Sequence, residues 1–310
     1  MFTGMSGADA RNAVAGDEGD LTDGPGDRAA GVRSALAGTR FADVRWVTTT
    51  GSTNADVLAL ARDGAPEGVV VVADHQSAGR GRRTRRWVAP PGGSLLVPVL
   101  MRPPAGVASA VTMAAAVAMA DAVEAVAGVK VGLKWPNDLV VGDRKLAGIL
   151  AEADWPTGTT IAAGYRRPGA HERVVVVVGI GLNVVWPRLP LADGTEPDAP
   201  SPEEIAEVVD RATALNWLGA EADRADLLVA FLRRLDERYG DLVSAGPEGT
   251  LRAWRERSAT LGRRVRVDLG PDDVEGTAVD VTGEGHLVVD TLEGERRVLA
   301  VGDVVHLRPA

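Results

Sequence analysis

The chain has 310 residues, a formal net charge of −9 at pH 7 and 45% hydrophobic residues. This length predicts about two domains, and the composition is apolar enough for a sizeable core, which excludes a wholly disordered chain. The acidic balance disfavours a general nucleic-acid-binding protein. The absence of cysteine excludes disulfides, thiolate catalysis and cysteine-bound zinc.

No targeting or membrane segment is expected. The N-terminus has no basic stretch followed by an apolar one. The longest weakly polar run, near Ala110–Ala120, is shorter than the roughly 20 apolar residues that a membrane-spanning helix needs. The four histidines show no metal-ligand spacing. We therefore expect a cytoplasmic protein without membrane association.

The first half of the chain predicts strands and helices after an unstructured start. Residues 1–38 are rich in glycine, alanine and aspartate and show no periodicity, which predicts a disordered tail. Ser52 or Thr53 is a suitable N-cap for a helix that ends at Gly64. The other expected elements are strands at Arg45–Thr49, Val69–Asp74, Ser94–Met101 and Val129–Trp135, and a buried helix at Val107–Ala127.

The second half predicts a hairpin, two helices and a series of short strands. Gly142 and Asp143 suit a two-residue turn between strands Leu139–Val141 and Lys145–Glu152. A capping box with proline at the first helical position opens a helix at Ser201. Further expected elements are a strand from Arg173 to Val178, a helix around 227–235, and strands at 264–269, 274–281, 286–292 and 297–305. Together they predict an α+β domain at 39–261 and a small all-β domain at 262–310.

An arginine- and glycine-rich segment, Gly79–Trp87, follows a buried strand. Glycine lets a backbone approach a ligand closely, and guanidinium groups match the oxygens of phosphates and carboxylates. Crowding like charges is costly, so the loop is expected to be poorly ordered without a bound anion. It is no dinucleotide-binding fingerprint, because Thr84 replaces the third glycine. A small anionic ligand, a nucleic acid and a merely solvated basic loop remain open.

The segment Lys134–Asp138 precedes the predicted hairpin that carries Lys145. If Gly142 and Asp143 form the turn, Asp138 and Lys145 project from one face as diagonal neighbours, about 7–8 Å apart at the backbone. A surface salt bridge there would stabilise the fold by about 1 kcal/mol or less. The mostly apolar strand after Lys145 instead favours a functional pair, in which a carboxylate holds a lysine beside a reacting phosphate.

The segment Gly179–Asn183 follows a run of β-branched residues. Its glycines can mark a bulge or a bend in the strand. They can equally form a floor on which a ligand lies against the backbone. The pattern alone does not separate these two interpretations.

Taken in order, these segments resemble the motifs of the biotin protein ligase family. Two departures are Thr84, where the family commonly has glycine, and Gly51, where an acidic residue is frequent. The N-terminal winged-helix domain of those members that double as transcriptional repressors is also missing, so we expect no DNA binding. The resemblance rests on Gly51–Asn54, Gln76 with Gly79–Arg83, Trp87, Lys134–Asp138, Arg144–Leu150 and Gly179–Asn183.

The resemblance implies an ATP- and magnesium-dependent ligase that converts biotin to biotinyl-5′-adenylate and transfers it to a lysine of a biotin carboxyl carrier domain. It implies a mixed sheet packed by helices, as in class II synthetase-like catalytic domains, and a C-terminal SH3-like β-barrel. The implied catalytic residues are Lys145, Arg82, Lys134 and Asp138. The implied biotin contacts are Ser52, Thr53, Asn54, Gln76, Arg80, Gly81, Arg82, Trp87, Lys145 and Gly148. The implied nucleotide contacts are Arg82, Arg83, Trp87, Lys134, Asn137, Lys145, Gly179, Gly181 and Asn183, with no metal site formed by the protein.

Two other functions are weighed against this one. Lipoate and octanoate ligases share the implied fold, but their arginine–glycine signature that runs into a His-Asp pair is absent. A non-catalytic RNA-binding module is disfavoured by the net acidity and by Lys145 on an apolar strand. The expected acceptors are carrier domains of acyl-CoA or pyruvate carboxylases, and the residues leave a monomer and a homodimer open.

Overall fold

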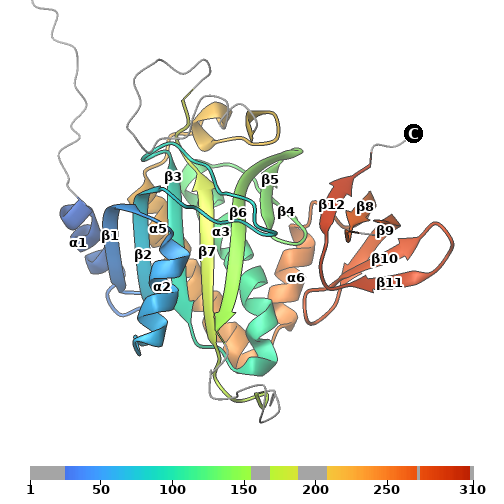
Figure 1. Ribbon diagram of the computed structural model, residues 1–310, viewed down its shortest axis with the longest axis horizontal. Coiled ribbons are helices and arrows are strands. Elements are labelled where there is room, and N and C mark those ends of the chain that lie inside the picture. The colour runs from blue at the N-terminus through green and yellow to red at the C-terminus, as the bar shows by residue number, and fades with distance from the viewer. Residues whose placement is uncertain (1–24, 155–167, 188–207, 271–272, 308–310) are drawn as a thin grey trace, which may run out of the picture.

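A computed structural model describes residues 25–154, 168–187, 208–270 and 273–307. The larger of its two sheets has seven strands in the order β1-β2-β3-β7-β6-β5-β4 (Figure 1). Strands β1 and β2 are parallel, and the remaining neighbours are antiparallel, which confirms a mixed sheet. The strands are β1 Asp43–Thr50, β2 Val69–Gln76, β3 Ser94–Met101, β4 Gly132–Lys134, β5 Asp138–Val141, β6 Arg144–Asp154 and β7 Val175–Asn183.

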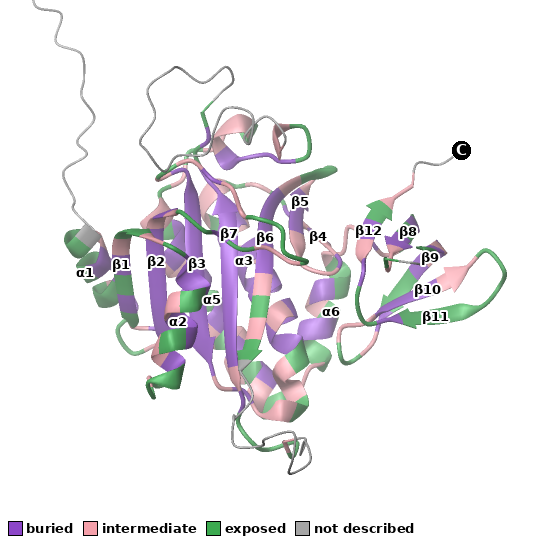
Figure 2. Ribbon diagram, in the orientation of Figure 1, coloured by how far each residue is buried: buried purple, intermediate pink, exposed green. Residues whose placement is uncertain are grey.

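Helices cover both faces of this sheet. Helices α1 (Pro25–Ala35), α3 (Val111–Ala127), α5 (Arg224–Ala245) and α6 (Glu248–Glu256) enclose the main core with one face. Helix α2 (Thr53–Arg62) packs on the other face, against β2, β3 and β7. Short 3₁₀ turns are also present, η1 at Ala105–Ala110 and η3 at Leu215–Leu218. Figure 2 shows that the central strands are buried, as their apolar, β-branched sequences require.

The central helix α3 continues from η1 without interruption. Ala105–Ala127 is long and apolar enough to cross a membrane by length and composition alone, so the expectation that no run reaches that length was wrong. Two thirds of its most apolar window is buried inside the protein, where α3 packs against α5, α6 and the sheet. The helix ends at Gly128, whose φ of 66° is the left-handed conformation typical of a helix C-terminus. Packing in the core accounts for its apolar sequence.

The second sheet has five antiparallel strands in the order β11-β10-β9-β8-β12. They are β8 Arg264–Asp268, β9 Asp273–Val281, β10 Leu287–Thr291, β11 Arg296–Leu299 and β12 Asp303–His306. The small C-terminal β domain is therefore confirmed, but the single strand expected at 297–305 was wrong. The chain turns at Gly302, with φ of 148°, and β12 pairs with β8.

The start of the ordered chain also differs from expectation. Residues 25–36 are not part of a disordered tail: α1 packs on β1 and α5, and Ala29, Val32 and Leu36 are buried. Their spacing of three and four residues is helical, but the glycine- and alanine-rich context obscured it. Residues 1–24, and most of the helix expected from Ser201, lie outside the described residues. Helix α6 was not expected, and β4 is shorter than predicted.

Replacing Leu36 tests this correction. Leu36 is completely buried, so Leu36→Ala is expected to lower the free energy of unfolding by about 2–5 kcal/mol in chemical denaturation. The matched control is Ser34→Ala, an exposed position in α1, which is expected to change it by less than about 0.5 kcal/mol. Equal stability of the two variants would contradict the burial of Leu36.

Candidate active site

A cleft lies on the α2 face of the larger sheet. Its space of about 730 Å³, part of it open to solvent, is in the range of small-molecule sites. The connection between β2 and β3 crosses in front of β7 and β6 and covers it (Figure 1). The lining residues are Ser52, Thr53, Asn54, Gln76, Arg80, Gly81, Arg82, Arg85, Arg86, Trp87, Leu96, Asn137, Lys145, Gly148, Ile149, Leu150, Gly179, Ile180 and Gly181.

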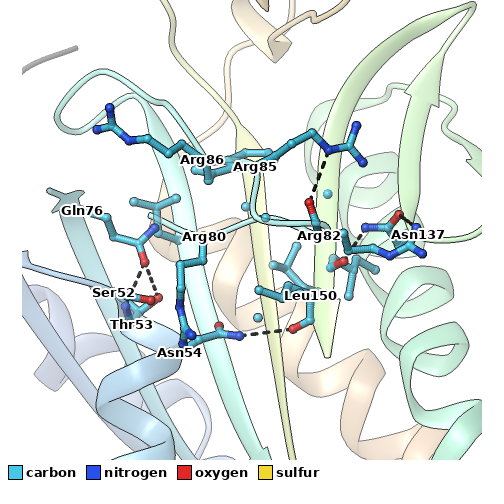
Figure 3. Close-up of a pocket in the computed structure, with 18 of the residues that line it drawn as sticks. Ser52, Thr53, Asn54, Gln76, Arg80, Arg82, Arg85, Arg86, Asn137 and Leu150 are labelled. Carbon is cyan, nitrogen blue, oxygen red and sulfur yellow. Dashed lines mark hydrogen bonds between the residues drawn. The ribbon is translucent and has the colours of Figure 1, made fainter. Parts of the chain in front are cut away.

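One end of the cleft is formed by the start of α2 and the end of β2. Ser52 stands at the N-cap position, but its side chain makes no capping hydrogen bond. Gln76 takes that role, because its Oε1 accepts from the backbone N (2.8 Å) and the Oγ1 (3.0 Å) of Thr53. Figure 3 shows Gln76, Ser52 and Thr53 grouped at this end. The arrangement concentrates polar groups where a ligand with both donors and acceptors can bind.

Asn54, in the first turn of α2, reaches across to the strands of the cleft floor. Its Nδ2 donates to Leu150 O (3.3 Å) and to Glu152 Oε2 (2.9 Å). Its Oδ1 lies so close to Gly179 that no Cβ could fit there. Glycine is therefore required at position 179 for this close approach of Asn54. The sequence had left open whether the glycines of Gly179–Asn183 mark a bend in the strand or form a floor for a ligand.

The predicted contact between Asp138 and Lys145 is present. Lys145 Nζ lies 2.6 Å from Asp138 Oδ1, and the hairpin pairs Val140 with Lys145 as expected. The route differs, because a bulge shifts the register so that Asp138 pairs with Gly148. Such bulges are common next to functional sites, where they change the direction of a side chain. The ammonium group lies on the cleft wall, 5.6 Å from the ring centre of Trp87.

Two glycines make room for Trp87 on the floor. A Cβ on Gly181 would lie 2.5 Å from Cε2 of Trp87, and one on Gly148 would lie 2.9 Å from Cζ3. The indole Nε1 is buried and has no hydrogen-bond partner among the described residues. The ring thus lies directly on the backbone of β6 and β7, on the floor of the cleft.

The other end of the cleft is positively charged and is organised by Asn137. Asn137 Nδ2 donates to Ile149 O (2.6 Å), which leaves Oδ1 to accept from Arg82 Nη1 at 3.2 Å. Burial lowers the pKa of the Arg82 guanidinium, and the nearby Asp303 and Asp138 oppose that shift. The group stays charged, and Figure 3 shows it beside Asn137, away from the Ser52 end.

Carboxylates of the second sheet hold the arginine loop. Asp303 lies 3.0 Å from Arg85, 3.5 Å from Arg82 and 3.7 Å from Arg83. Arg83 also lies 3.5 Å from Asp268, which is paired with Asp303 across β8 and β12. The expectation that the loop needs a bound anion was incomplete, because the protein itself supplies the counter-charges.

Four of the predicted site residues do not line the cleft. Asp138 contacts the lining residue Lys145 but does not itself border the cleft. Lys134 lies opposite Asp138 in β4, with its charge close to His306. Arg83 faces the second sheet. Asn183 is buried, where it accepts from Ser94 and donates to Thr213 O, so both ends of its amide are used within the protein.

Several lining residues were not predicted. Arg85 and Arg86 belong to the loop already singled out, and Leu96 lies on β3. The other unpredicted lining residues are Ile149 and Leu150 on β6 and Ile180 on β7. Glu152, which does not line the cleft, was also missed, although it alternates on β6 with Leu150 and with the predicted Gly148. Residues two apart in a strand share a face, so this spacing could have placed Glu152 beside the cleft.

Comparison with known proteins identifies the family. Residues 47–162 match the biotin/lipoate A/B protein ligase family, and residues 260–307 match the biotin protein ligase C-terminal domain. The chain is 38% identical over 281 residues to a biotin–[acetyl-CoA-carboxylase] ligase of Mycobacterium tuberculosis, covering 88% of this chain and 92% of that one. The chain belongs to the biotin protein ligase family.

Other members of the biotin protein ligase family agree with this assignment. A biotin–[acetyl-CoA-carboxylase] ligase of Paracoccus denitrificans is 31% identical and covers 82% of this chain and 97% of its own length. The biotin protein ligase of Aquifex aeolicus in complex with biotin and ATP superimposes with a TM-score of 0.65 at 24% identity, over 86% of this chain and 99% of that one. The latter supports the fold, including the C-terminal β domain.

The close packing on the cleft floor gives a stability prediction. Gly181→Ala forces a Cβ against Trp87 and is expected to lower the free energy of unfolding by about 1–3 kcal/mol, as overpacking does. Gly249→Ala, at an exposed position in the first turn of α6 with open space around it, is the control and should raise it by about 0.4–1 kcal/mol. Chemical denaturation measures both, and the same sign for both would contradict the packing.

Proposed function

We propose that this enzyme uses ATP to activate biotin and then attaches the biotin to a lysine of a carboxylase carrier domain. The observation that carries the proposal is Lys145, held by Asp138 in one cleft with a polar end at Ser52–Gln76 and an arginine loop above it. A cleft with these two ends suits a molecule with a polar ring at one end and a carboxylate at the other.

In the first step, a carboxylate oxygen of biotin attacks the α-phosphorus of ATP. The bond from that phosphorus to the β-phosphate oxygen breaks, pyrophosphate leaves, and biotinyl-5′-adenylate forms. Both reactants are anions, so fixed positive charge is the main assistance the protein can give. Lys145 and Arg82 line the cleft where these anions would meet, and Asp138 and Asn137 hold them in place.

In the second step, the amine of the acceptor lysine attacks the acyl carbon of the mixed anhydride, and AMP leaves. Ser52, Thr53, Asn54, Gln76 and Arg80 would bind the ureido ring throughout. The loop Gly79–Trp87 covers the cleft and would exclude water, which otherwise hydrolyses the anhydride. Gly179 and Gly181 would border the nucleotide, as would Trp87.

The family implies magnesium, and the described residues provide little for it. They contain no group of three or more histidine, cysteine, aspartate or glutamate side chains placed to hold a metal ion. We infer that magnesium is bound mainly by the phosphates of ATP and by water, as is common for nucleotide-bound magnesium. None of the steps assigned to Lys145 or Arg82 depends on a metal ligand from the protein.

Lipoate or octanoate is the alternative substrate. It is favoured by one finding, the match of residues 47–162 to a family that includes lipoate ligases. The C-terminal domain match and the 38% identical relative favour biotin. Polar side chains at Ser52, Thr53 and Gln76 also suit a ureido ring better than an acyl tail.

We further propose the bounds and roles of the two domains, the acceptor, the location of the enzyme and its oligomeric state. Residues 39–261, with α1 packed on them, form the catalytic domain, and residues 262–310 form the domain that supports the arginine loop. The acceptor is a biotin carboxyl carrier domain. The enzyme acts in the cytoplasm, without binding DNA or membranes, as a monomer or a homodimer.

The exchange of pyrophosphate with ATP, measured with magnesium and an added carboxylic acid substrate, tests this function. Biotin, lipoate and octanoate are compared at equal concentration. Exchange with biotin alone supports the proposal. Exchange with lipoate or octanoate instead would reassign the substrate, and no exchange with any of the three from folded protein would reject the adenylation step.

The same assay tests the role of Lys145. Lys145→Ala removes a fixed charge from the reacting centre and is expected to slow the exchange by about 10²-fold or more. The control is Lys130→Ala, an exposed lysine outside the cleft, which should keep the parent rate. Circular dichroism and thermal unfolding establish that both variants are folded. A parent-like rate in Lys145→Ala would remove the central assignment.

A further inference from the structure

Glu152, on β6, lies just behind the cleft wall and contacts two of its lining residues. One carboxylate oxygen, Oε2, accepts from Asn54 Nδ2 at 2.9 Å and from Arg80 Nη2 at 3.1 Å. Asn54 and Arg80 line the cleft, but Glu152 does not. Figure 3 shows Asn54 and Arg80 together at the same end as Ser52 and Gln76. A single carboxylate thus joins α2, the arginine loop and β6.

The two acceptors around Asn54 determine which way its amide points. Glu152 Oε2 and Leu150 O both need a donor, so the side facing them must be the NH₂ group. The carbonyl Oδ1 then faces Gly179, on the cleft floor, where the missing Cβ leaves room for it. Without Glu152, Leu150 O alone would hold the amide, at 3.3 Å.

The solvent exposure of the Arg80–Glu152 ion pair indicates that Glu152 contributes more to the orientation of its neighbours than to the stability of the fold. The side chain of Arg80 is 45% exposed and that of Glu152 is 25% exposed. Ion pairs this close to solvent contribute little to stability. By contrast, Asn54 is almost fully buried, so its orientation is set by its hydrogen bonds and not by water.

We propose that Glu152 is a positioning residue for biotin: it orients the Asn54 amide and the Arg80 guanidinium toward the ureido ring. The inference rests on the proposed function. Asn54 Oδ1 offers an acceptor for a ureido N–H, and Arg80 offers donors for a ureido oxygen. An acyl tail without polar groups would gain nothing from this arrangement. Glu152 therefore serves recognition of the ring, whereas Asn137 holds Arg82 for the phosphate chemistry at the other end.

The test is pyrophosphate exchange with separate titrations of biotin and ATP. Glu152→Ala is expected to raise the KM for biotin by about tenfold or more. Its kcat and its KM for ATP should stay within about twofold of the parent, because the Arg82 end is untouched. Glu152→Gln keeps an oxygen that accepts from Asn54 and Arg80, so its KM for biotin should rise less.

The matched control is Glu237→Ala. Glu237 also bonds an arginine, Arg234 at 3.0 Å, but on the exposed surface of α5. It is expected to match the parent in all three constants. A KM for biotin within twofold of the parent in Glu152→Ala would overturn the proposal. Equal rises in the KM values for biotin and ATP would also overturn it, because they would indicate a general structural role.

Two further comparisons complete the test. If Glu152→Ala does not fold, Glu152→Gln, Arg80→Ala and their combination decide. The combined rise in the KM for biotin should be smaller than the product of the single rises, and independent effects would overturn the proposal. The parent is measured first. Absence of biotin-dependent exchange there would reject the proposed function and this role with it, whereas normal exchange in both parent and Glu152→Ala rejects the role of Glu152 alone.

Discussion

The contact between Lys145 and Asp138 is the constraint around which the cleft is arranged. The Lys145 side chain is 36% exposed, so its ammonium group needs a partner to stay in one place. Asp138 provides that partner, with Oδ1 at 2.6 Å from Nζ. The partner is within reach because the hairpin pairs Val140 with Lys145, which makes Asp138 a diagonal neighbour of the lysine. A bulge in the same β5–β6 hairpin brings Gly148 opposite Asp138, where the missing side chain admits Trp87 beside the ammonium group. One hairpin thus positions both the lysine and the floor of the cleft.

Ion pairs between the arginine loop and carboxylates of both sheets link the two sheets. Several arginines in one short loop repel each other, and burial makes that repulsion stronger. Asp268 and Asp303, at the paired ends of β8 and β12, reduce it from the second sheet, while Glu152 does so from the first. The covering loop therefore depends on three anchors in different parts of the chain, and its shape reflects the positions of both sheets.

Most of the sheet and the hairpin pair could be predicted from local patterns. The β-branched run Val69–Val72 determines a strand, and the Gly142-Asp143 turn determines the pairing of Val140 with Lys145, with little help from the rest of the chain. The bulge beyond that pair could not be predicted from the turn. The anchors of the arginine loop could not be predicted, because Asp303 reaches Arg85 across 218 residues of sequence. Likewise, α1 was missed, since its small residues carry little amphipathic signal until β1 and α5 are in place to bury them.

The anchor at Asp303 has a consequence for how the protein is made. The arginine loop is synthesised 218 residues before the carboxylate that holds Arg85. At roughly 5–20 residues per second, a ribosome needs about 10–45 s to add that stretch. During this time the sheet and α2 can form, but the cover of the cleft lacks its distal anchor. A nascent chain would therefore hold an open cleft, and competence to retain a reactive intermediate would arrive only with the last strand.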